Sequence, residues 1–134
     1  MRPGLSIGFF GRFGRSPALR EFDTALRSVD LHPNLVPEAV KLTAVRMLQD
    51  HTGREEPGAY ASRAAAEIIA YCMIGAEAFA GANSSEQAED IEGRIEAALD
   101  QGASLDAKLV LLTLHARVIQ PSVVDHFGLE VVSD

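Results

Sequence analysis

The chain has 134 residues, of which 47% are hydrophobic and 23% charged, a composition that excludes intrinsic disorder and predicts one hydrophobic core. Its single cysteine, Cys72, excludes an internal disulfide, so we expect the reducing environment of the cytoplasm. The net charge is −7, and because residues 1–20 carry four arginines and no acid, the rest of the chain is acidic and ill suited to binding nucleic acid.

Residues 1–15 are predicted to form an N-terminal arm, followed by a helical bundle domain over residues 16–134. Glycines at every third position from Gly8 to Gly14 interrupt any helical or strand pattern in the arm. No secretory signal is indicated, and a mitochondrial presequence stays open because the first twenty residues are basic. Five residues of the arm are candidates for an interaction: Phe9, Phe10, Arg12, Phe13 and Arg15.

Aromatic and basic side chains together suit three kinds of contact. They could stack on nucleotides, insert at an anionic membrane surface, or dock on an acidic helical surface. We favour docking, either on the chain itself or on a neighbouring subunit, because the rest of the chain is acidic.

Apolar residues at helical spacing, bounded by start and stop signals, predict five helices. The first and second cover residues 17–30 and about 37–52, the third 59–82, the fourth 85–101 and the fifth 105–120. Pro121 starts a short helical turn that Gly128 ends, and residues 129–132 form an apolar tail that packs or makes an edge strand. The expected fold is an all-α, single-domain bundle of about five helices plus a short C-terminal helical turn.

The third helix is the expected centre of the bundle. Its apolar side holds many alanines, which let neighbouring helices approach closely. Residues 64–82 are long enough to cross a membrane, but Glu67 and Glu77 interrupt them, so no transmembrane segment is expected. We interpret both glutamates as solvated charges, and the fourth helix as an acidic, solvent-facing element.

No motif for a metal, a nucleotide or another cofactor is present. The sequence lacks Glu-x-x-His, His-x-x-x-His and Cys-x-x-Cys spacings, and the acidic stretch from Asp100 to Asp106 fails as a calcium loop at its sixth and twelfth positions. The spacing of the N-terminal glycines matches neither a P-loop nor a dinucleotide fingerprint. We therefore expect no cofactor and no metal site.

Three residues are candidates for lining a ligand pocket between the third and fifth helices: His115, Tyr71 and Cys72. Apolar neighbours surround His115 on its helix, so it is either a general base with a lowered pKa or an ordinary core or interface residue, and we favour the latter. Cys72 reads in the same way as a small core side chain before a reactive thiol.

The function is not apparent from any motif, so we weigh three hypotheses. The first is a non-enzymatic helical interaction or oligomerisation module with a protein partner, including a homodimer. The second is a small-molecule-binding or catalytic bundle with a pocket near His115. The third is a peripheral contact with nucleic acid or a membrane through the basic N-terminal arm. We expect that the chain is not an enzyme.

Overall fold

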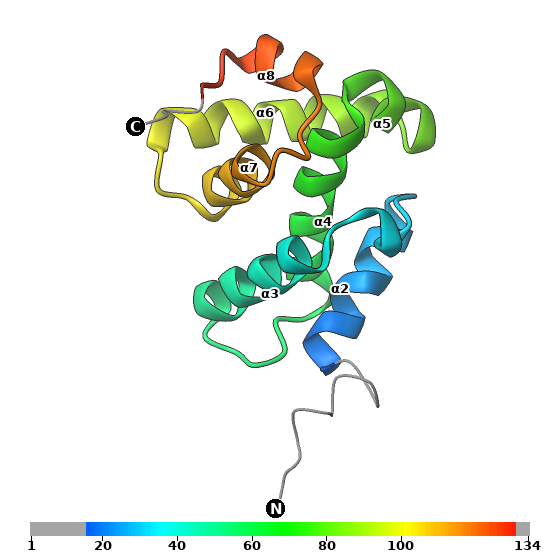
Figure 1. Ribbon diagram of the computed structural model, residues 1–134, viewed down its shortest axis with the longest axis vertical. Coiled ribbons are helices and arrows are strands. Elements are labelled where there is room, and N and C mark those ends of the chain that lie inside the picture. Colours follow the sequence, from blue (N-terminus) through cyan, green and yellow to red (C-terminus); the bar gives the residue numbers. More distant parts are fainter. Residues whose placement is uncertain (1–15, 131–134) are drawn as a thin grey trace, which may run out of the picture.

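The structure, a computed structural model, describes residues 16–130, and these residues form helices and no β-strand (Figure 1). In chain order the elements are α2 (Pro17–Ser28), the 3-10 turn η1 (Pro33–Leu35), α3 (Glu38–Thr52), α4 (Ala59–Ile74), α5 (Ala76–Ala82), α6 (Ser85–Gln101), α7 (Leu105–His115) and α8 (Pro121–Phe127). The all-α class is confirmed. No helix among the described residues is long and apolar enough to span a membrane.

Three predicted helix starts are confirmed, because backbone amides of the first turn donate hydrogen bonds to the capping serines. The side-chain oxygen of Ser16 accepts from the amide of Leu19 at 3.2 Å, and Ser84 accepts from Gln87 at 3.0 Å. Ser104 caps α7 in the same way, by accepting from the third residue of the turn that follows at 3.1 Å. Each serine thereby satisfies an amide that the first helical turn leaves without a backbone partner.

The predicted helix over residues 59–82 is wrong, because it is two helices. Gly75 separates α4 from α5 with a φ of 92° and a ψ of 164°, a conformation that residues with a side chain rarely adopt. The described residues therefore form seven α-helices, whereas the sequence predicted five helices and a short helical turn. The fifth predicted helix is also too long, since α7 ends at His115 and not near residue 120.

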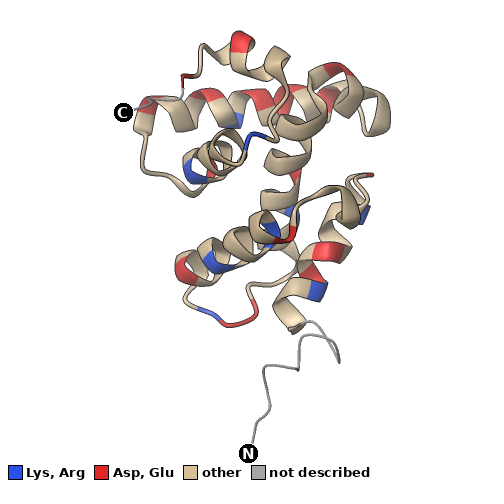
Figure 2. Cartoon of the chain, viewed as in Figure 1, with Lys and Arg blue, Asp and Glu red and all other residues tan. Residues whose placement is uncertain are grey.

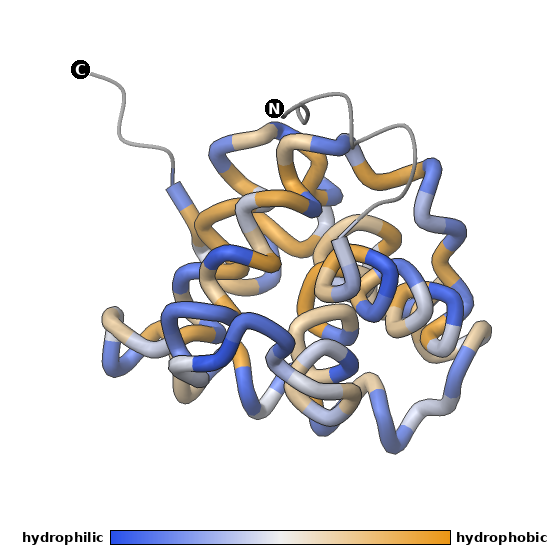
Figure 3. Tube along the Cα trace, turned by 90° about the horizontal axis from the view of Figure 1, so that it is seen from below, coloured by the Kyte–Doolittle hydropathy of each residue, from blue (hydrophilic) through white to orange (hydrophobic). Residues whose placement is uncertain are grey.

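The predicted central position of the third helix is confirmed for α4. Helices α2, α3, α6 and α7 all pack against it, and Figure 1 shows it running between the α2–α3 pair and the group formed by α5 to α8. Its fully buried side chains include Ala65, Ala66 and Ala70, so the neighbouring backbones can approach closely. Hydrophobic and hydrophilic residues alternate along the surrounding turns, as expected for helices with one buried side (Figure 3).

Residues 1–15 and 131–134 lie outside the described residues. The predicted arm, with Phe9, Phe10, Arg12, Phe13 and Arg15, belongs to the first of these segments. The end of the predicted apolar tail belongs to the second, while residues 129 and 130 follow α8 without regular structure.

Candidate functional site

A groove opens between α7 and α8, at the end of the domain where α4 terminates. Its wall consists of five apolar residues and two charged ones, and its volume is about 330 Å³: Leu114, Arg117, Ile119, Pro121, Val124, Asp125 and Leu129. We call this the α7–α8 groove. Leu114 is the buried residue of this wall, while Arg117 and Asp125 are exposed.

Two helix ends of the same type shape this groove. After α7, Arg117 adopts a φ of 61° and the amide of Val118 donates to the carbonyl of Thr113 at 3.1 Å. After α8, Gly128 adopts a φ of 62° and the amide of Leu129 donates to the carbonyl of Val124 at 3.0 Å. Both are Schellman arrangements, which reverse the chain and here place Arg117, Ile119 and Leu129 at the groove.

One hydrogen bond fixes the segment between these helices to the core. The amide of Gln120 donates to the carbonyl of Cys72 near the end of α4 at 2.8 Å, and Pro121 then starts α8. The Ser122 hydroxyl lies 3.4 Å from the position that a Cβ on Gly75 would occupy, an ordinary van der Waals distance, so the positive φ of Gly75 and not a lack of space disfavours a side chain there. The start of α8 therefore lies beside the break at Gly75.

A second concavity, the Tyr71 hollow, lies beside this break. Its volume is about 300 Å³ and it is lined from α4, α5 and α8 by Tyr71, Ala76, Glu77, Ser122, Val123 and His126. The Tyr71 hydroxyl donates to Glu92 on α6 at 2.7 Å, and its ring makes edge contacts with Phe79 and Phe127. Burial, together with this hydrogen bond, raises the pKa of Tyr71 well above its usual range, so the phenol stays neutral.

The structure does not bring the three predicted pocket residues together. Tyr71 and Cys72 are buried neighbours on α4, but only Tyr71 lines the hollow. Burial raises the pKa of the Cys72 thiol to about 12, and a hydrogen bond with Thr113 offsets only part of this effect. Cys72 is therefore a protonated core side chain and not a nucleophile.

His115 is exposed, contrary to the apolar surroundings that its helix suggested. It is the last residue of α7 and lies outside both the Tyr71 hollow and the α7–α8 groove. The exposed positions of α7 are Lys108, Leu111 and His115, so apolar neighbours on the helix did not indicate that His115 lies on a buried face.

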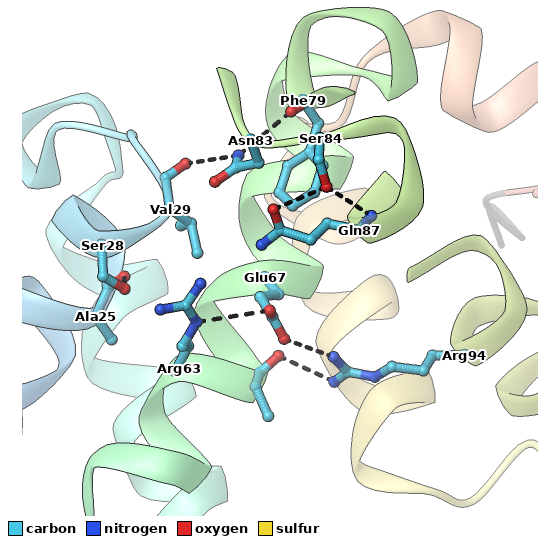
Figure 4. Close-up of polar contacts among 11 residues, drawn as sticks. Ala25, Ser28, Val29, Arg63, Glu67, Phe79, Asn83, Ser84, Gln87 and Arg94 are labelled. Carbon is cyan, nitrogen blue, oxygen red and sulfur yellow. Dashed lines mark hydrogen bonds and ion pairs between the residues drawn. The ribbon is translucent and has the colours of Figure 1, made fainter. Parts of the chain in front are cut away.

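A charged cluster around Arg94 was missed by the sequence reasoning. Arg94 on α6 makes a two-point contact with Asp106 on α7, at 2.9 and 3.2 Å, and donates to Glu67 on α4 at 3.0 Å. A third acceptor is the Ala64 carbonyl at 2.9 Å. Figure 4 shows Glu67 between Arg63 and Arg94, with a contact to each. Glu67 also pairs with Arg63 at 3.7 Å, so it is not the solvated charge that we expected.

The Arg94 cluster joins three helices, and its charged groups pair with one another. Burial would lower the pKa of Arg94, but the hydrogen bond to Asp106 and the two carboxylate charges outweigh burial and raise it. A polar hollow of about 370 Å³ lies over the cluster, lined in part by Tyr60 and Asp90. Because carboxylates already occupy Arg94, we interpret the cluster as a structural link and not as an anion site.

Arg94 is also the only base on α6, so the exposed side of that helix is acidic. Exposed acids recur along it at Glu86, Glu89, Asp90, Glu96 and Asp100 (Figure 2). Helix α6 packs against α7, which forms one wall of the α7–α8 groove. An acidic helix therefore packs against one wall of the groove, whose own lining carries one charge of each sign, Arg117 and Asp125.

The described residues contain no group of histidine, cysteine, aspartate and glutamate side chains that could hold a metal ion. Comparison of the chain with protein-family models, curated proteins and solved structures found no match.

Proposed function

We propose that this chain is a non-enzymatic helical oligomerisation module in which the α7–α8 groove of one copy is covered by a second copy. The observation that supports the proposal is the groove itself, with five apolar side chains, four of them partly or fully exposed, beside one cation and one anion. Covering such a surface releases water from apolar area, which is the main driving force of association.

The charge distribution favours a second copy as the partner. From residue 21 onward the chain has eight bases against nineteen acids, so an apolar groove on this acidic part of the chain suits a segment that is both basic and apolar. The chain itself carries a segment of this composition in residues 1–15. Self-association therefore needs no further partner to supply the complementary chemistry.

The test is the mass of the full chain in solution over a dilution series. We expect twice the mass of one chain at high concentration, falling toward the single mass on dilution. Val124→Lys places a charge in the groove and should shift the protein to the single mass. Leu42→Lys is the matched control, because Leu42 is an exposed leucine of α3 outside the groove, and it should leave the mass unchanged.

Two results would contradict the proposal. One is a single-chain mass for the unmodified protein at every concentration. The other is a doubled mass that Val124→Lys leaves intact while circular dichroism shows that the variant is folded.

A second candidate function is the binding of a small aromatic amine in the Tyr71 hollow. It is favoured by three polar side chains that line one concavity and make no hydrogen bond among the described residues: Glu77, Ser122 and His126. Apolar atoms of Val123 and Ala76 would contact a ring, and the Glu77 carboxylate would pair with an amine. Benzylamine should raise the melting temperature of the protein but not that of Glu77→Gln, and equal shifts in both would exclude the site.

A further inference from the structure

We infer that the segment covering the α7–α8 groove is residues 9–13 of a second copy, and that two copies exchange these segments in an antiparallel pair. The inference rests on the proposed oligomerisation and names the residues that carry it out. Its three parts are the chemistry of the segment, its reach, and the position of the groove relative to the start of α2.

The chemistry of the segment complements the groove. Phe9, Phe10 and Phe13 are apolar and rigid, which suits a wall of leucine, isoleucine, valine and proline. Arg12 and Arg15 supply positive charge for Asp125 at the rim and for the acidic excess of the chain from residue 21 onward. Two acidic domains repel each other, so a contact made through the basic segment is the one that electrostatics favours.

The segment begins at the opposite end of α4 from the groove. Ser16 and Pro17 line a small hollow with Glu55 and Glu56, just before α4 begins at Ala59. The groove lies past the other end of α4, where Gln120 is bonded to Cys72. Thirteen residues separate Ala59 from Cys72, a distance of about 20 Å at 1.5 Å per residue (Figure 1).

Reach therefore prevents the three phenylalanines from filling the groove of their own chain. A chain extends by at most about 3.6 Å per residue, so Phe13, three residues before Ser16, reaches about 11 Å. Phe10 and Phe9 reach about 22 Å and about 25 Å only when the chain is fully extended, which leaves little chain to pass around the domain. Occupation of the groove by all three phenylalanines therefore requires a second copy.

An antiparallel arrangement satisfies both copies at once. When two domains lie side by side with their α4 helices in opposite directions, the start of α2 in each copy stands beside the groove of the other. Both grooves are then filled by the same pair, and the assembly closes with two-fold symmetry without open ends.

The experiment is a complementation between two variants of the full chain. The segment variant carries Phe9→Ser, Phe10→Ser and Phe13→Ser with an intact groove, and the groove variant carries Val124→Lys with an intact segment. Each variant alone should have the mass of one chain, which is half the mass expected for the unmodified protein. A mixture of the two should recover the doubled mass, because one segment and one groove remain able to pair.

The control for folding is Asp125→Lys, which reverses one exposed rim charge and keeps the apolar wall. It should weaken the pair and increase its dependence on concentration, while its circular dichroism matches that of the unmodified chain.

The outcomes separate the inference from the proposed function. A doubled mass in the segment variant together with a single mass in the groove variant would refute the inference and leave oligomerisation through the groove standing. A mixture that stays at the single mass would also refute the exchange. A lowered melting temperature without a change of mass in the segment variant would indicate docking on its own chain, for example in the hollow beside Glu55, and would refute it as well.

Discussion

Replacing Arg94 by methionine should be among the most destabilising changes at any polar position of the described domain. Methionine keeps the apolar stem of the side chain but removes every donor, so Glu67 and Asp106 lose their shared cation. The side chains of Arg94, Glu67 and Asp106 are 24%, 19% and 27% exposed. Breaking a fully buried pair costs about 3–5 kcal/mol, and partial hydration of the two carboxylates reduces this to about 2–3 kcal/mol.

Arg63→Met is the matched control, because it removes an arginine that pairs with the same Glu67. Arg63 is 46% exposed and its contact is 3.7 Å, so the loss should stay below about 1 kcal/mol. Urea unfolding followed by far-UV circular dichroism gives both free energies. A cycle that combines Arg94→Met with Asp106→Asn should show a coupling of about 1 kcal/mol or more.

Equal losses for Arg94→Met and Arg63→Met would refute the reasoning, since burial and the number of acceptors would then not matter. A strong dependence of the Arg94→Met loss on salt would refute it too, because screening acts mainly on exposed charges.

Three further predictions concern residues on or near α4 and one concerns α7. The unfolded Cys72 thiol ionises at its usual pKa of 9.0, whereas burial keeps the folded thiol protonated. The free energy of unfolding should therefore fall by about 1.4 kcal/mol between pH 8 and 10 on account of this thiol, and Cys72→Ala should remove this contribution to the pH dependence. A thiol reagent at neutral pH should modify Cys72 only in urea, and fast labelling of the folded chain would contradict its burial. Tyr71→Phe should cost about 1 kcal/mol in urea unfolding by removing the bond to Glu92, and no change would mean that water replaces it. His115→Leu should alter stability by less than about 0.5 kcal/mol in the same assay, whereas a larger loss would point to a buried role.

The helix starts could be predicted from the sequence because their signals are local. A serine that caps a helix acts on amides two or three residues away, so Ser16, Ser84 and Ser104 marked α2, α6 and α7 correctly. The central place of α4 was also predictable, since the many alanines on its apolar side let neighbouring helices approach closely.

The helix ends were less predictable. Gly75 lies inside a run of good helix formers, and the break between α4 and α5 becomes visible only in its backbone conformation, with a φ of 92°. After α7, Arg117 adopts a positive φ, a conformation in which glycine or asparagine is usual. No residue type at this position therefore indicated the end of α7.

The charged contacts depended on tertiary packing and could not be found by pattern. Arg94 meets Glu67 twenty-seven residues away, and no spacing rule connects positions on different helices. Lys41 is a similar case, because it is buried and bonds to Asp23 on α2 at 3.2 Å, although its place on α3 looked ordinary. The groove was missed for the same reason, since it is formed by chain reversals and not by a motif.

The alanines of α4 have a consequence for how this sequence can diverge. Ala65, Ala66 and Ala70 are fully buried where four helices converge, so a larger side chain there must push a whole helix aside. The exposed leucines, by contrast, can change with little effect on folding. Among related sequences, or in a saturation mutagenesis screen, the strictest conservation should therefore fall on the smallest and chemically plainest residues of the chain.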